Sequence, residues 1–114
     1  MSSMKSEKTP AQAAEFIDNV ARLRGWVANP DESFRGILAD GLATNANRYG
    51  YFLCPCRDGD GDRSADRDII CPCTYAEQDI AEYGQCFCGL FLSKARAESG
   101  GELKQIPERR YQGQ

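Results

Sequence analysis

The six cysteines of the sequence all lie in one stretch, between residues 54 and 88. One residue separates the two members of each pair, 14 residues separate the first pair from the second, and 12 separate the second from the third. Such regular spacing indicates that the thiols act together, as metal ligands, as redox catalysts or as a disulfide framework. The three pairs are Cys54 and Cys56, Cys71 and Cys73, and Cys86 and Cys88.

A framework of structural disulfides requires an oxidising compartment, and the start of the sequence argues against one. Residues 1–8 contain lysines and serines but no apolar stretch of the kind that directs secretion. We therefore expect a cytoplasmic protein. In a reducing cytosol clustered thiols act more often as metal ligands or redox catalysts than as a disulfide framework, so the first two roles are favoured.

Zinc held by four thiolates is the simplest metal site to consider. Zinc ribbons usually place two residues between paired cysteines, however, and four ligands would leave two of the six cysteines unexplained. Six thiols divide more naturally into four ligands and one dithiol. The sequence has no histidine. This excludes histidine-based acid–base catalysis, Cys-His proteases, zinc fingers with two histidines and haem bound through an axial histidine.

The overall composition indicates one small folded domain over residues 1–114. Hydrophobic residues make up 41% of the 114 residues and charged residues 27%, which is typical of a globular chain. The formal charge is −3, opposite in sign to that of a basic nucleic-acid-binding domain. No apolar run approaches the roughly 18 residues of a membrane span. We expect neither nucleic acid nor a membrane as a partner.

The loop between the first two cysteine pairs carries charges of both signs. Its Asp58–Asp62 stretch alternates Asp and Gly like the start of a calcium loop, but Ile69 stands at position twelve, where a Glu ligand is required. Arginines near the pairs could attract an acidic partner. They are interleaved with aspartates, so a solvated mixed-charge loop is the favoured interpretation. The arginines are Arg48, Arg57, Arg63 and Arg67.

Two amphipathic helices precede the cysteines. Thr9 and Pro10 form a typical helix start, and the apolar spacing that follows predicts a helix over about residues 10–28. A second start at Asn29-Pro30 predicts a helix to about residue 46. We expect the apolar stripes to form the core. Their members are Ala13, Phe16, Ile17, Val20, Leu23 and Val27, then Phe34, Ile37, Leu38 and Leu42.

Shorter elements surround the cysteine pairs. Residues 49–53 are expected to be extended, residues 74–83 to form a short helix that ends at Gly84, and residues 90–99 to form a short strand or helix. The predicted fold is therefore small and mostly α, with irregular segments. Residues 1–8 and 102–114 are polar, and we expect flexible ends there.

Four segments of the chain carry a family resemblance: residues 45–51, the Cys-Pro-Cys-Arg sequence ending at Arg57, the second Cys-Pro-Cys and the Cys-Phe-Cys-Gly-Leu-Phe sequence ending at Phe91. Together they resemble the catalytic (beta) subunit of ferredoxin:thioredoxin reductase. The resemblance covers nearly the whole chain and implies helices packed around a 4Fe–4S cluster. The chain departs from the family pattern at Phe87, where a histidine is usual, and in the gaps between the pairs. These departures suggest a divergent branch.

The resemblance also implies residue roles. Cys56 and Cys88 match the redox-active disulfide, with Cys56 as the nucleophile that attacks a thioredoxin-like acceptor and Cys88 as the sulfur that binds the cluster when the disulfide is cleaved. Electrons would come singly from a reduced ferredoxin or a similar low-potential donor. The sequence gives no basis for requiring the family's second, variable subunit. The cluster ligands would be Cys54, Cys71, Cys73 and Cys86.

Two other function classes stay open at this point. One is an iron–sulfur electron carrier in which Cys56 and Cys88 perform no dithiol chemistry, and the other is a zinc-bound structural module. Phe87 is a candidate modulator, because a phenyl ring supplies no proton and makes the surroundings of the neighbouring sulfurs drier. Iron and sulfide analysis separates the zinc module from the other two classes, and thiol counting separates the carrier from the reductase.

Overall fold

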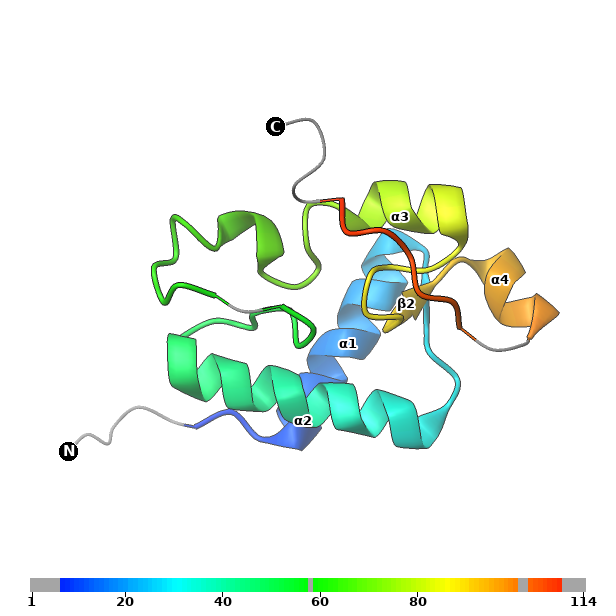
Figure 1. Cartoon of the computed structure of the whole chain (residues 1–114). Coiled ribbons are helices and arrows are strands. Elements are labelled where there is room, and N and C mark those ends of the chain that lie inside the picture. Colours follow the sequence, from blue (N-terminus) through cyan, green and yellow to red (C-terminus); the bar gives the residue numbers. More distant parts are fainter. Residues whose placement is uncertain (1–6, 58, 101–102, 110–114) are drawn as a thin grey trace.

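The computed structural model describes residues 7–57, 59–100 and 103–109. Its elements follow in the order α1 (Pro10–Arg24), β1 (Val27–Ala28), α2 (Glu32–Tyr49), the 3-10 helix η2 (Arg67–Ile69), α3 (Ala76–Tyr83), β2 (Phe91–Leu92) and α4 (Lys94–Ser99). Helices α1 and α2 pack against each other, and β1 and β2 form a two-stranded antiparallel sheet beside them (Figure 1). The prediction of a small, mostly helical fold with irregular segments is confirmed.

Helix α1 begins where the sequence predicts. The Thr9 side chain accepts a hydrogen bond from the backbone N–H of Gln12, whose side chain accepts one from the backbone N–H of Thr9. This capping box satisfies two backbone donors that have no partner within the helix. The helix ends at Gly25, in the left-handed conformation at φ 75°, earlier than the predicted end at residue 28. Val27 and Ala28 instead form β1.

Helix α2 begins later than predicted. Asp31, and not Asn29, is its N-cap, with Oδ1 accepting from the N–H of Phe34 at 3.1 Å. The Asn29 side chain points inward, and its Nδ2 donates to the carbonyl of Gly89 at 2.8 Å. The helix also continues to Tyr49, past the predicted end at residue 46 and into the stretch predicted to be extended, before Gly50 ends it.

The main hydrophobic core combines the facing sides of α1 and α2 with residues around the cysteine pairs. Ile17 and Leu42 are fully buried, as predicted. Leu23 and Ile37 were expected in the core but are 78% and 66% exposed. Successive residues of a helix are rotated by about 100°, so the buried residues recur at every third or fourth position on one side. Leu23 and Ile37 lie on another side of their helices.

The described part of the C-terminal segment, residues 103–109, runs back over α3 and the cysteine region (Figure 1). The sequence led us to expect flexibility here. In the structure Ile106 is 6% exposed, and two side chains of the segment form ion pairs with the rest of the chain. Residues 1–6, 101–102 and 110–114, which belong to the predicted flexible ends or adjoin them, lie outside the described residues. No helix in the described part is long and apolar enough to cross a membrane.

Candidate functional site

Backbone hydrogen bonds bring the first and second cysteine pairs together. Leu53 and Ile70, each directly before a cysteine, form an antiparallel bridge. The N–H of Cys54 donates to the carbonyl of Ile69 at 2.9 Å, and the N–H of Cys71 donates to that of Phe52 at 2.7 Å. The loop between the pairs thus closes on itself, and cysteines 17 positions apart in the sequence lie side by side.

The third pair lies in a turn between α3 and β2. Helix α3 ends at Gly84 (φ 81°), as predicted, and the chain then forms a turn in which the N–H of Gly89 donates to the carbonyl of Cys86. The N–H of Cys86 donates to the carbonyl of Phe91 in β2, which is 1% exposed. The sheet and the core therefore hold this pair in place.

Five of the six cysteines line one small cavity, together with Pro72, Ala76, Phe87 and Phe91. The five are between 3% and 9% exposed, whereas Cys56 is exposed and does not line the cavity. The six cysteines, which come from three separate segments of the chain, thus form one inner group and one exposed cysteine. The inner cysteines are Cys54, Cys71, Cys73, Cys86 and Cys88.

Cys88 connects the inner group to the outward thiol. Its Sγ lies 3.9 Å from the Sγ of Cys86, and interactions with the thiols of Cys54 and Cys56 help to raise its pKa. None of the six cysteines, all of which lie in the described part of the chain, is in a disulfide in this structure. Hydrogen bonding by Cys88 lowers the pKa of Cys54 to about 7 and also lowers the pKa values of Cys56 and Cys86, whereas the pKa of Cys88 itself is raised well above its usual value.

The second pair is in a different electrostatic setting. Burial raises the pKa of Cys71 well above its ordinary value and that of Cys73 to about 12. A thiol is a metal ligand only when deprotonated, so two thiols in this apolar position need a nearby positive charge to ionise. A bound metal centre would supply such a charge at Cys71 and Cys73.

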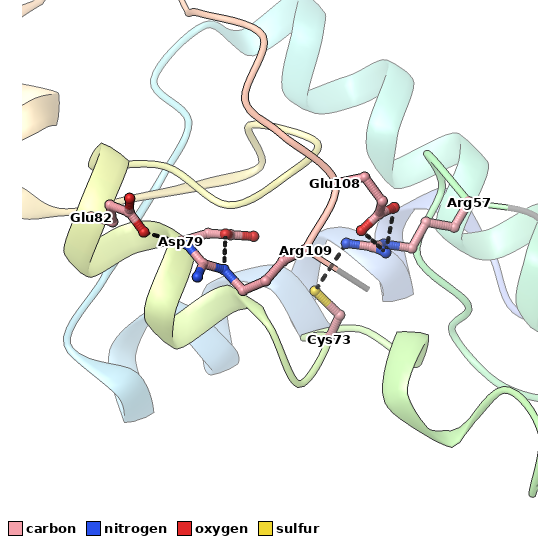
Figure 2. A network of polar contacts seen from close by, with 6 residues as sticks. All are labelled: Arg57, Cys73, Asp79, Glu82, Glu108 and Arg109. Atoms are coloured by element: carbon pink, nitrogen blue, oxygen red, sulfur yellow. Dashed lines mark hydrogen bonds and ion pairs between the residues drawn. The ribbon is translucent and has the colours of Figure 1, made fainter. Parts of the chain in front are cut away.

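Arg57 is part of the site, although the sequence favoured a solvated loop for it. Its side chain is 3% exposed, its Nη2 lies 3.9 Å from the Sγ of Cys73, and its Nη1 contacts both carboxylate oxygens of Glu108 at 2.7 Å (Figure 2). The guanidinium also lies 4.6 Å from the centre of the Phe87 ring. The signal available in the sequence was its position: Arg57 directly follows Cys56 and so reaches the site with the first pair.

The inner thiols line a common cavity, and a cubane cluster with one thiolate on each iron needs several thiols around one space. Among the described residues, no group of three or more His, Cys, Asp or Glu side chains is already arranged to hold a metal ion. The buried Nε–H of Arg57 has no hydrogen-bond partner in the described structure, and an anionic cluster with its thiolate ligands would offer an acceptor beside it.

Comparison with known proteins identifies relatives of the whole described region. The family model described as "Ferredoxin thioredoxin reductase catalytic beta chain" matches residues 3–111. The ferredoxin-thioredoxin reductase catalytic chain of Guillardia theta is 36% identical over 88 residues, which are 75% of this chain and 82% of that protein. The corresponding chain of Synechocystis sp. is 27% identical over 108 residues, 93% of this chain and 87% of that protein.

The chain spans less than two thirds of the length of some of the relatives that it matches. The matched region spans 59% of the chloroplastic catalytic chain of Arabidopsis thaliana, at 33% identity over 91 residues and 77% of this chain. It spans 65% of the catalytic chain of Porphyra purpurea, at 32% identity over 82 residues and 69% of this chain. Catalytic chains of this family bind a 4Fe–4S cluster, and the cysteine-lined cavity fits one. With a family match over almost its entire length, the chain belongs to the ferredoxin thioredoxin reductase catalytic beta chains.

Proposed function

We propose that the chain is an iron–sulfur disulfide reductase. Electrons would arrive one at a time from a reduced ferredoxin or a similar low-potential donor and leave as a dithiol that reduces a thioredoxin-like protein. The observation that supports this most strongly is the position of Cys88, whose thiol lies at the cavity and also reaches the exposed thiol of Cys56. One sulfur therefore lies between the electron-storing site and the surface.

We assign the ligands of the cluster from the family resemblance, with which the cavity lined by five cysteines is compatible. Four inner cysteines would each bind one iron, and Cys88, the fifth, would stay free to pair with Cys56. When bound, the cluster supplies electrons singly, while a disulfide needs two. The apolar lining of the cavity, which includes the buried Phe91 and the half-buried Phe87, limits the access of water to this exchange. The proposed ligands are Cys54, Cys71, Cys73 and Cys86.

The exposure of Cys56 indicates which of the two thiols reacts first with the acceptor. The Cys56 thiolate attacks the acceptor disulfide, forms a mixed disulfide and releases one acceptor sulfur as a thiolate. The Cys88 thiolate then attacks the Cys56 sulfur, releases the second acceptor thiolate and leaves a Cys56–Cys88 disulfide. Two electrons from the donor and two protons restore the dithiol. The sulfurs that this chain contributes to these steps are those of Cys56 and Cys88, and the need for a second subunit stays open. The cytoplasmic location stays a prediction.

The Cys56→Ser variant tests the assignment, because Cys56 is the cysteine that the cavity does not include. We expect C56S to keep the visible absorption and iron content of the unmodified protein and to lose reduction of a thioredoxin disulfide. C73S is the matched control, since it makes the same atomic change at a proposed ligand and should lose the iron as well. Turnover by C56S would contradict the reductase proposal, and an iron-containing protein that never forms a dithiol would instead be an electron carrier.

A further inference from the structure

The C-terminal segment 103–109 is fastened to the site-bearing half of the chain at several points. The Gln85 side chain exchanges hydrogen bonds with the backbone of Lys104, at 2.8 and 3.2 Å. Ile106 is buried, and the Arg109 Nε donates to Oδ1 of Asp79 in α3 at 2.8 Å. Between these anchors the segment places Glu108 against Arg57 (Figure 2). A stretch remote from the cysteines in sequence thus reaches the arginine beside Cys73.

Arg57 is enclosed on every side that the structure describes. Its guanidinium lies 4.6 Å from the Phe87 ring centre and 5.4 Å from that of Tyr75, both distances at which a cation is attracted to an aromatic face. Glu108 contacts it on one side and the Sγ of Cys73 on another. Because the rings exclude water, salt and solvent screen this charge far less than a surface charge.

We propose that Arg57 is a positioning residue that holds a positive charge against the Cys73 side of the iron–sulfur site, and that Glu108 sets how much of this charge the site experiences. The inference rests on the proposed function in that the site must hold a cluster. It also gives Phe87 a role: the ring between Cys86 and Cys88 supports the guanidinium that contacts Cys73.

The expected effect has a definite sign. Reduction adds negative charge to the site, so a nearby cation stabilises the reduced form and raises the reduction potential. The Glu108 carboxylate offsets part of that attraction. Neutralising Glu108 should therefore raise the potential of the cluster, and neutralising Arg57 should lower it.

The test is an anaerobic, dye-mediated redox titration of the full chain, followed by the visible absorption of the cluster. We expect the midpoint potentials to fall in the order E108Q, unmodified protein, R57M, from highest to lowest, with R57M/E108Q between the two single variants. E98Q and R67M are matched controls, because they remove the same charges at exposed positions, and they should leave the potential unchanged. The intensity of the absorption reports cluster content in every sample.

Different results contradict the proposed function and the role of Arg57. An unmodified protein that never binds an iron–sulfur cluster contradicts the proposed function. A cluster that is present at full occupancy, with the same potential in E108Q as in the unmodified protein, contradicts the role of Arg57 and Glu108 and leaves the reductase proposal intact. If R57M does not hold a cluster, the potential of E108Q relative to the unmodified protein tests the proposal, because E108Q retains Arg57 and all six cysteines.

Discussion

Replacing Gly89 by alanine should destabilise the protein at the turn that carries the third cysteine pair. Gly89 directly follows Cys88 and has φ 77°, a conformation that costs an L-residue about 1–2 kcal/mol. A Cβ at this position would also lie 2.5 Å from Cδ1 of Leu103. Overpacking of this kind typically adds about 1–3 kcal/mol, and the lower end applies here because the contact is the far end of a flexible side chain. We expect G89A to lower the free energy of unfolding by about 2–3 kcal/mol.

Two further variants separate the conformational contribution from the steric one. Gly25 has nearly the same φ, 75°, but a Cβ added there would meet no atom within 4 Å, so G25A should cost only the conformational part, about 1–2 kcal/mol. Adding G89A to an L103A background should cost less than adding it to the unmodified chain, because the clash is gone.

Urea unfolding followed by far-ultraviolet circular dichroism measures these differences in the free energy of unfolding. The slope of this free energy against urea concentration should be the same for all variants. The reasoning is wrong if G89A is no less stable than G25A, or if the cost of G89A is the same with and without the Leu103 side chain. Loss of cluster absorption at urea concentrations below the unfolding midpoint of G89A would show that the turn orients Cys86 and Cys88 as well as stabilising the fold.

Three other predictions concern separate parts of the chain. C71S, like C73S, should fail to retain iron, because each removes a proposed ligand, and iron content close to that of the unmodified protein would contradict this. Burial and the hydrogen bond to Asp66 raise the pKa of Tyr51 to about 12, so the folded protein should lose stability as the pH rises from 10 to 12. In urea titrations across that range, the free energy of unfolding of Y51F should fall by less than that of the unmodified protein. Gly36 lies in α2 with open space around it, and G36A should raise the free energy of unfolding by up to about 1 kcal/mol; a decrease would refute the open-space argument.

Features that depend on neighbouring residues could be predicted from the sequence. Thr9, Pro10 and Gln12 lie within one helical turn, and the start of α1 is where they place it. Gly84 ends α3 as expected, since glycine adopts the left-handed conformation without cost. The six cysteines also come together, as the regular spacing of their pairs indicated.

Features that depend on contacts distant in sequence could not be predicted. Asn29 looked like a helix cap, but its side chain hydrogen-bonds to Gly89, 60 positions away, so Asp31 caps the helix. Ile37 fits an apolar stripe in sequence, yet only the actual packing of α1 on α2 shows that it lies outside. Arg57 lay among charged residues, and its burial depends on Glu108, which the sequence analysis assigned to a flexible end.

The central claim, that four cysteines bind a cluster while Cys56 and Cys88 form a redox-active dithiol, is tested most directly by mapping alkylated cysteines by mass spectrometry. The protein is purified anaerobically and treated with iodoacetamide before and after reduction, with the cluster intact. The account predicts that alkylation after reduction appears at Cys56, and at Cys88 to the extent that the reagent reaches it, while the other four cysteines stay protected in both samples. Labelling that does not change on reduction, or a colourless protein that binds zinc through these cysteines, would contradict it.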